Sequence, residues 1–269
     1  MNHEEYERMY RFEDTYWWFV ARRKLIASLI KSYYGNQNDL RILDIGCGTG
    51  AMLDQLAPFG EVIGADFAEQ ALGFCRRRGD RYALARSDAR RLPFASNTFD
   101  IVTAMDIVEH IDNDKAAMSE IMRVLKPGGR VFVTVPAYQS LWSEHDVALH
   151  HYRRYTAPMV KDLFQRVGLR IDKLTYAVTS LFPAAWTYRQ VSKQLKRGKK
   201  NAEPKADLIP MPPRVNSALI TLLEWETSAV NKIALPFGLT VACVARKEST
   251  PLPQPLSPPG KGGKESPAQ

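Results

Sequence analysis

A glycine-rich turn follows the first apolar run of the chain: residues 43–50 read LDIGCGTG, and Ala51 comes next. Gly46 and Gly48 have no Cβ, so a ligand can lie directly against the backbone there. The helix expected after Gly50 begins with free N–H groups. The run GCGTGA also fits the dinucleotide pattern G-x-G-x-x-G/A. The turn therefore predicts a site for a nucleotide-like ligand and leaves open which one.

Three carboxylates at fixed places along the chain narrow this choice. Asp66 ends the second apolar run, twenty residues after Gly46, where it can accept both hydrogen bonds from a ribose diol or, alternatively, cap the next helix. Asp44 precedes the turn, and an anion there is unhelpful beside a pyrophosphate but favourable near a sulfonium and an ammonium. Asp88, in SDARRLPF, can accept a hydrogen bond from an adenine amino group. These carboxylates favour S-adenosylmethionine over NAD.

The stretch SEHDVALHHYRRYT, residues 143–156, is the second place where reactive side chains gather. His145, Asp146 and His151 could supply a general base, with Asp146 orienting an imidazole. The alternative is a hydrogen-bonded loop cluster with no catalytic part. Although His and Asp are also zinc ligands, their spacing here matches no firm metal pattern, so no metal site is predicted.

The same stretch ends in two arginines and a tyrosine. Arg153, Arg154 and Tyr155 could hold an acidic or phosphorylated acceptor. Glu109 and His110, in the earlier run MDIVEHI, are expected nearby, either in the site or only at the start of a helix. Polar loop residues at the mouth of a pocket often bind ligands, so substrate contacts are expected here.

These residues lie at the ends of short apolar runs. From residue 40 to Pro136, expected strands alternate with expected helices, and the strands read as buried on both faces. Such alternation predicts a doubly wound, mainly parallel sheet whose ligands bind beyond the carboxyl ends of the strands. Two further strands are expected in GLRIDKLTYAV and GLTVACVARK, with some fifty mostly helical residues between them. One helix is expected over residues 4–34.

Charge and cysteine content limit the classes of partner and the cellular compartment. The 269 residues carry a formal net charge of +8, which permits nucleic acid, acidic lipid or a phosphorylated substrate as partner without choosing among them. Three widely spaced cysteines favour a reducing compartment over a disulfide framework. The polar N-terminus differs from a secretory signal, and no apolar run reaches membrane-spanning length. We expect a cytoplasmic protein, with contact to the inner face of the membrane left open and the oligomeric state unknown.

The motifs, taken in order, resemble the class I S-adenosylmethionine-dependent methyltransferases, within a type 11-like bacterial subgroup. The resemblance covers residues 40–136 and, more loosely, 137–247. It rests on five motifs, LDIGCGTG, VIGADF, SDARRLPF, FDIVTAMDIVEHI and RVLKPGGRVFVTVP. It implies a Rossmann-like doubly wound α/β sheet of seven strands in the order 3-2-1-4-5-7-6. The last strand would be antiparallel, with a helical insertion between strands 6 and 7.

The resemblance also implies S-adenosylmethionine as the cofactor and gives each matching position a part of it. Asp44, Gly46, Gly48 and Gly50 would shape the methionine end, and Asp66 would bind the ribose. The adenine would contact Phe67, Asp88 and Ala89, and Asp106 would line the mouth where the methyl group is transferred. Phe67 would pack on the adenine face, although plain core packing is the alternative for an aromatic side chain.

Residues 1–247 are expected to form one methyltransferase domain, with a helical cap at 1–38 and a helical lid at 179–236; the low-complexity tail 248–269 is predicted to be disordered. The run YWWFVARRKLI resembles a bacterial subgroup in which this segment covers the cofactor pocket. Trp17, Trp18 and Phe19 would then close the site, with Trp17 and Trp18 facing substrate. Arg22 or Arg23 would pair with the methionine carboxylate. The alternative is an amphipathic helix packed on the sheet.

Methyl transfer to a small-molecule or lipid-linked acceptor, at oxygen or carbon, is the expected activity. The reaction needs alignment and exclusion of water, and a base only where the acceptor loses a proton. The basic, partly apolar insertion suits an amphiphilic acceptor at an anionic membrane, or is simply a lid with a solvated charge run. The other possibilities are an NAD-binding oxidoreductase, a nucleic-acid methyltransferase and a cofactor-binding module without catalysis. The chain shows neither a Tyr–Lys pair nor an Asn/Asp-Pro-Pro-aromatic motif to support the first two.

Overall fold

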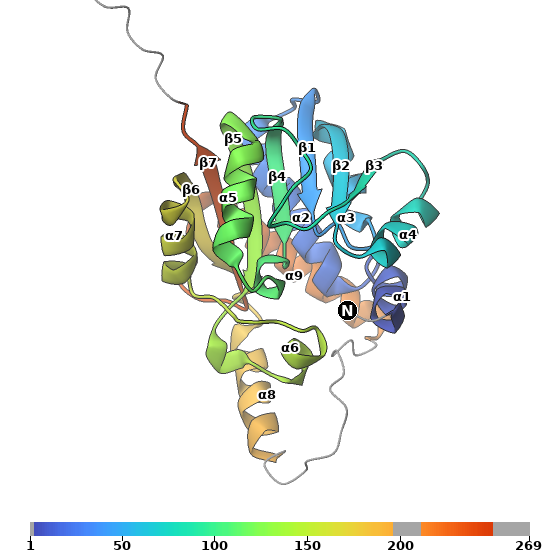
Figure 1. Cartoon of the computed structure of the whole chain (residues 1–269). Coiled ribbons are helices and arrows are strands. Elements are labelled where there is room, and N and C mark those ends of the chain that lie inside the picture. The colour runs from blue at the N-terminus through green and yellow to red at the C-terminus, as the bar shows by residue number, and fades with distance from the viewer. Residues whose placement is uncertain (1–2, 196–210, 250–269) are drawn as a thin grey trace, which may run out of the picture.

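The computed structural model describes residues 3–195 and 211–249, and a seven-stranded sheet is its centre (Figure 1). The strand order is β3-β2-β1-β4-β5-β7-β6. Strands β1 to β5 pair in parallel, whereas β7 lies antiparallel between β5 and β6. The predicted α/β class, strand order and antiparallel last strand are confirmed. The strands are β1 (Leu40–Ile45), β2 (Gly60–Asp66), β3 (Ala83–Arg86), β4 (Phe99–Met105), β5 (Leu125–Pro136), β6 (Leu169–Ala177) and β7 (Thr240–Lys247).

Helices cover both faces of this sheet. The α-helices are α1 (His3–Phe12), α2 (Trp17–Tyr34), α3 (Ala51–Leu56), α4 (Glu69–Arg77), α5 (Asp114–Val124), α6 (Glu144–Ala148), α7 (Ala157–Arg166), α8 (Phe182–Leu195) and α9 (Pro213–Lys232). Short 3-10 turns are η1 (Ala57–Phe59), η2 (Val108–His110) and η3 (Gln139–Leu141). One hydrophobic core lies beneath α5 and α7, and a second lies beneath α2, α3 and α9. Because both faces are covered, the central strands are apolar almost throughout, as parallel strands must be.

The N-terminal segment is two helices, so the single helix expected over residues 4–34 is wrong. The chain breaks between Phe12 and Trp17, where Glu13 turns inward and is only 5% exposed. Its carboxylate accepts hydrogen bonds from the Thr49 hydroxyl and from Arg78, the latter at 2.7 Å. A buried carboxylate is stable only with such partners. The hydrogen bonds of Glu13 at this break therefore connect the N-terminal segment to the glycine turn.

Helices α8 and α9 form the insertion between β6 and β7, as predicted. The α9 helix packs against α2. Asn231 Nδ2 donates to Ser28 Oγ at 2.7 Å, and the backbone N–H of Trp17 donates to Asn216 Oδ1 at 2.9 Å. In contrast, α8 extends away from the sheet (Figure 1). The boundaries proposed for cap, lid and tail stay predictions.

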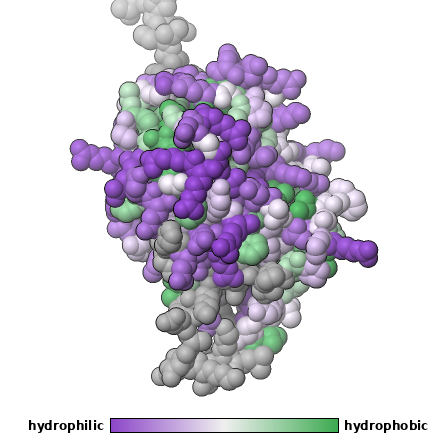
Figure 2. Space-filling view, turned by 90° about the vertical axis from the view of Figure 1, so that its right-hand side faces the viewer, coloured by the Kyte–Doolittle hydropathy of each residue, from purple (hydrophilic) through white to green (hydrophobic). Residues whose placement is uncertain are grey.

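Part of the basic insertion and most of the tail, residues 196–210 and 250–269, fall outside the described ranges. Within residues 3–195 and 211–249, no helix is both long and apolar enough to cross a bilayer. Figure 2 shows the right-hand side of Figure 1 as a mostly hydrophilic surface with separate small hydrophobic areas.

Candidate functional site

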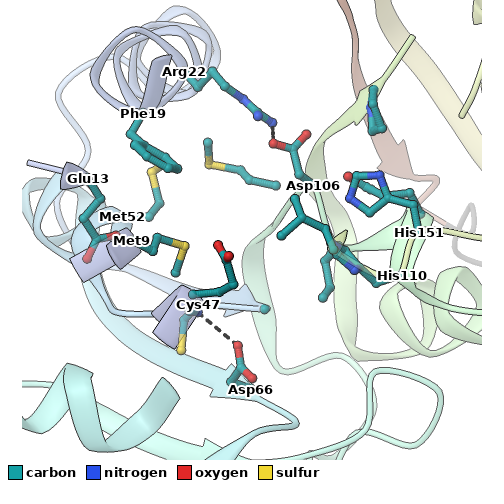
Figure 3. A pocket seen from close by; sticks show the side chains of 18 of the residues that line it. Met9, Glu13, Phe19, Arg22, Cys47, Met52, Asp66, Asp106, His110 and His151 are labelled. Atoms are coloured by element: carbon teal, nitrogen blue, oxygen red, sulfur yellow. Dashed lines mark hydrogen bonds and ion pairs between the residues drawn. The ribbon is translucent and has the colours of Figure 1, made fainter. Parts of the chain in front are cut away.

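A cavity of about 920 Å³ opens beyond the carboxyl ends of β1, β2, β4 and β5. This is the edge where ligands bind in doubly wound sheets. Figure 3 shows Met9, Phe19 and Met52 on one wall and His110 and His151 on the opposite wall. The cavity therefore brings the glycine turn and the polar stretch 143–156, far apart in the chain, to one space.

The glycine turn has the backbone shape that its sequence predicted. Gly46, Gly48 and Gly50 have φ angles of 70°, 55° and 93°, which side chains disfavour. A Cβ on Gly46 would lie 2.7 Å from Ile107 Cγ1, and one on Gly48 would lie 2.7 Å from Met9 Cε. Gly46 and Gly48 line the cavity, whereas Gly50 does not and acts only through the shape of the turn.

Asp66, at the end of β2, links its strand to the glycine turn. Its Oδ2 accepts from the Gly48 N–H at 3.0 Å, and its Oδ1 accepts from the Ala68 N–H at 2.9 Å. Burial raises the pKa of this carboxyl, and the backbone hydrogen bonds oppose that effect. Each oxygen keeps a lone pair for a further donor, so the carboxylate can accept both hydroxyls of a ribose.

The region predicted for adenine lies beside Asp66. Phe67 is 68% exposed and lines the cavity, so the alternative of core packing for this ring is wrong. Ala89 also lines the cavity. The Asp88 carboxylate is held by Arg90, whose Nη2 lies 2.7 Å from Asp88 Oδ2, and these bonds lower the pKa of Asp88. Asp88 therefore reaches a ligand only through lone pairs that Arg90 leaves free.

Asp44, predicted for the methionine end, is 2% exposed at the cavity wall. The Thr103 hydroxyl donates to its Oδ1 at 2.6 Å. Burial raises the pKa of Asp44 to about 7, against the effect of that hydrogen bond. A cation bound beside it would favour the charged carboxylate.

Asp106 follows β4 with a φ of 49° and forms an ion pair with Arg22 of α2 (Figure 3). Thr134 joins the pair, since its Oγ1 accepts from Arg22 Nη2 at 2.9 Å and donates to Asp106 at 3.2 Å. Burial lowers the pKa of Arg22 to about 10, while the nearby Glu109 opposes the shift. Arg22 thus contacts a protein carboxylate, and Arg23 donates to the Glu13 carbonyl. Both arginines line the cavity, but each of them already has a partner within the protein.

The predicted base cluster is organised around Asp146, which is fully buried. His151 Nδ1 lies 2.9 Å from Asp146 Oδ1, and Arg154 Nε lies 2.7 Å from the same oxygen. Burial would raise the pKa of Asp146, but the bonds from His151 and Arg154 hold it well below its usual range. His145 and His151 line the cavity, whereas Asp146 does not. Asp146 therefore positions the His151 imidazole and leaves Nε2 of that ring for chemistry.

The three residues predicted to bind substrate separate in the structure. Arg154 lines the cavity while bound to Asp146. Arg153 and Tyr155 do not line it, because both bind Asp114: Arg153 Nη1 donates at 2.7 Å and the Tyr155 hydroxyl at 2.8 Å. Their contacts join the end of the polar stretch to α5.

The tryptophans predicted to face substrate do line the cavity. Trp17 and Trp18 meet edge to face with ring centroids 5.5 Å apart, and the Arg22 guanidinium lies 5.0 Å from the centre of the Trp18 ring. The later turns of α2 bury Leu25 and Ile26 in the core. Helix α2 thus lines the cavity with its first two turns and packs on the sheet with the later ones.

Some cavity residues gave no sequence signal. Met9 and Glu13 lie in a stretch read as plain helix, and Arg189 of α8 reaches back to donate to the Leu141 carbonyl at 2.7 Å. Tyr188 also lines the cavity. Only the packing of distant segments brings these residues to the site. For Glu109 and His110 the motif MDIVEHI was the signal, and both line the cavity.

Residues 43–133 match a family model described as a methyltransferase domain. A demethylmenaquinone methyltransferase of Chlorobaculum parvum is 27% identical over 192 residues, 71% of this chain and 76% of that protein. A ubiquinone/menaquinone biosynthesis C-methyltransferase of Desulfotalea psychrophila is 31% identical over 148 residues, 52% of this chain and 56% of that protein. The chain spans about half the length of most of the curated relatives it matches.

Solved structures agree on the fold. Phosphoethanolamine N-methyltransferase 2 of Haemonchus contortus, in complex with S-adenosyl-L-methionine, aligns with a TM-score of 0.55 at 21% identity. The alignment covers 82% of this chain and 52% of that chain. The matched domain, the relatives and the strand order point the same way: residues 43–133 are a methyltransferase domain, and the fold is that of the class I S-adenosylmethionine-dependent methyltransferases.

Proposed function

We propose that this chain transfers the methyl group of S-adenosylmethionine to a small aromatic acceptor of the quinol type, at carbon or oxygen. One observation carries the proposal. The residues suited to the cofactor, Asp44 and Asp66, and the Asp146-held imidazole of His151 belong to the same neighbourhood around a single cavity. A donor and a proton acceptor in one space are what this reaction requires.

The cofactor would lie along the carboxyl ends of β1, β2 and β3. Asp66 would accept the ribose hydroxyls, while Phe67 and Ala89 would contact the adenine ring. The turn at Gly46 would admit the methionine end, whose two cationic groups would be favoured by Asp44. This placement directs the methyl group away from Phe67 and towards the wall that carries His151.

The acceptor would occupy the remaining space. At about 920 Å³ the cavity is at the upper end of the range of small-molecule sites, roughly 300–1,000 Å³, which leaves room beside a cofactor. Its wall includes aromatic rings from three segments of the chain: Trp17, Trp18, Phe19, Tyr152 and Tyr188. Flat rings suit a flat acceptor. The names of the relatives from Chlorobaculum and Desulfotalea support a quinone-type ring.

The reaction would be an in-line displacement at the sulfonium. A quinol attacks through oxygen or through a ring carbon, and in either case it must lose a proton. His151 is suited to take that proton at Nε2, because the Asp146 carboxylate accepts from Nδ1 and stabilises the imidazolium that forms. Trp17 and Trp18 would exclude water from the charged centre.

An acceptor with a lipid tail, met at a membrane surface, is the finer form of this proposal. Large apolar side chains are exposed on the two helices of the insertion, namely Trp186, Val191, Val215 and Trp225. Exposed aromatic and aliphatic side chains, in an insertion whose sequence also contains the basic run KQLKRGKK, suit peripheral contact with anionic lipid.

The experiment has two stages. Calorimetric titration with S-adenosylhomocysteine and, separately, NAD tests the cofactor: binding of NAD alone would refute the methyltransferase proposal. Transfer of labelled methyl from S-adenosylmethionine is then measured with 1,4-dihydroxynaphthalene, a short-chain demethylmenaquinol, and lipid and glycan extracts. We expect labelled quinols. Label found only in an extract free of quinols would refute the acceptor class while leaving the methyltransferase assignment in place.

A further inference from the structure

We propose that Glu109, His110 and His151 bind one divalent transition-metal ion, such as Zn²⁺, at the wall of the cavity. Each side chain offers one ligand atom, and these atoms lie within 4.8 Å of one another. All three residues line the cavity. The site is separate from the cofactor residues and goes beyond the proposed methyl transfer.

Glu109 is the strongest evidence that something is bound there. Its side chain is fully buried, and neither carboxylate oxygen has a hydrogen-bond partner among the described residues. Arg22 and Arg154 are the cations that face Glu109, yet each contacts another carboxylate, Asp106 and Asp146 respectively. A buried carboxylate requires either protonation or a cation of its own, and a metal ion aligned with both oxygens would supply it.

The two histidines are held in the manner of metal ligands. His151 Nδ1 is bound to the Asp146 carboxylate at 2.9 Å, and the backbone of Leu149 lies beside the His110 ring. The His151 ring therefore has one nitrogen fixed by the protein and the other left for a ligand. Histidines that bind metals usually donate their second ring nitrogen to a carboxylate or a backbone carbonyl in this way. The rings meet edge to face with centroids 4.5 Å apart.

The backbone also brings the two ligand-bearing segments together. Glu109 and His110 lie in η2, directly after β4, and the Tyr152 N–H donates to the Glu109 carbonyl at 2.8 Å. This bond pins the polar stretch to the turn, so the three side chains share one wall (Figure 3 shows His110 and His151 there). Ligand atoms bound at about 2.0–2.2 Å from a zinc ion need to approach one another by only about an ångström from their present places.

Two imidazoles and one carboxylate define the chemistry. This donor set suits zinc and other first-row divalent ions and leaves coordination positions open. The open side faces the cavity, where the hydroxyl of an acceptor could bind. A hydroxyl bound to such an ion loses its proton more readily, so with the ion bound at His151 Nε2 the ion would replace that nitrogen in assisting loss of the acceptor's proton.

The test uses the full chain after treatment with a chelator. Zn²⁺ content after gel filtration and the visible absorption of added Co²⁺ report metal binding without any activity assay. We expect one equivalent per chain in the wild type. Affinity should fall at least 100-fold in E109Q and in H110A, and 10- to 100-fold in D146N, which keeps all three ligands and weakens the bonds that hold His151 and Arg154. His150→Asn is the matched control, since His150 is exposed and does not line the cavity.

Two results would overturn the proposal. One is wild-type protein that binds no metal with micromolar affinity, and the other is metal bound equally well by the wild type, E109Q and H110A. Thermal unfolding shows whether each variant folds, and either of the two ligand variants suffices. S-adenosylhomocysteine titration of the same samples tests the proposed function separately: a protein that binds the cofactor product and no metal would refute only the metal site.

Discussion

The two halves of the cavity are built in different ways. The proposed cofactor half, from Asp44 to Ala89, uses a positive-φ glycine turn and the ends of neighbouring parallel strands, and the Gly48 N–H donates to Asp66 across it. The acceptor half uses side chains of α2, η2, the polar stretch and α8, joined by ion pairs such as Arg22 with Asp106. The shape of a site formed by backbone is fixed by the fold, so the ligand it accepts is fixed too. A site formed by side chains can change its ligand through single substitutions.

The largest effect is expected from removal of the imidazole in the acceptor half. His151→Ala should lower kcat about 100-fold or more, because a positioned general base contributes 10²–10⁴-fold. Binding of S-adenosylhomocysteine should stay within about threefold of the wild type, since His151 lies on the wall opposite Met9 and Met52, away from Asp66 (Figure 3). Steady-state kinetics and calorimetry measure the two quantities, with His150→Asn as the control. A variant that loses cofactor affinity and keeps kcat would contradict the division of the cavity.

The next effect tests the cofactor half. Asp66→Ala removes an acceptor of two charge-assisted hydrogen bonds from the ribose, each worth about 1.5–3 kcal/mol, so affinity for S-adenosylhomocysteine should fall about 100-fold or more. Glu61→Ala is the matched control, because Glu61 lies at the exposed opposite end of β2 and pairs with the exposed Arg41. Unchanged affinity in Asp66→Ala, measured by calorimetry, would remove the ribose assignment.

The same division explains what the sequence could predict. Strand and helix alternation, the glycine turn and the carboxylates at strand ends depend on local patterns and on one rule of parallel sheets, so the α/β sheet and the edge that carries the cavity could be predicted, while the strand order followed from the family resemblance. The position of Phe67 at the cavity followed from the resemblance. The break before Trp17 was not readable, because it depends on Glu13 meeting Arg78 some sixty residues later. Helix propensity is a local property and does not predict contacts between residues that are distant in the sequence.

The partners of side chains in the acceptor half could not be predicted from the sequence either. Arg153 and Tyr155 are chemically suited to bind an anion, but the competing carboxylate of Asp114 lies forty residues earlier and takes both. Arg22, one of the two arginines predicted to pair with the methionine carboxylate, forms an ion pair with Asp106 in the structure. In each case the sequence identified a reactive group, and only the fold determined its partner.

A smaller effect is expected from pH, again in the cofactor half. Asp44 has a pKa of about 7 in the free protein, raised from its usual value by burial. A bound sulfonium and ammonium favour the charged form, so the affinity for S-adenosylmethionine should rise about tenfold between pH 6 and pH 8 as Asp44 loses its proton before binding. In Asp44→Asn this rise should disappear and affinity should stay low throughout. An equal pH dependence in both proteins, measured by calorimetry, would show that Asp44 does not face the cationic end.

The smallest effect on activity is expected at Tyr155, and it sharpens the boundary of the acceptor half. The Tyr155 ring is 2% exposed and its hydroxyl donates to Asp114 at 2.8 Å, while Arg153 binds the same carboxylate oxygen. Tyr155→Phe keeps the packing of the ring and removes one hydrogen bond, so the free energy of unfolding should fall by about 1 kcal/mol in urea titrations. KM and kcat should remain within about twofold of the wild type. A large rise in KM with no loss of stability would instead place the hydroxyl in contact with the acceptor and extend the site behind the wall that Arg154 forms.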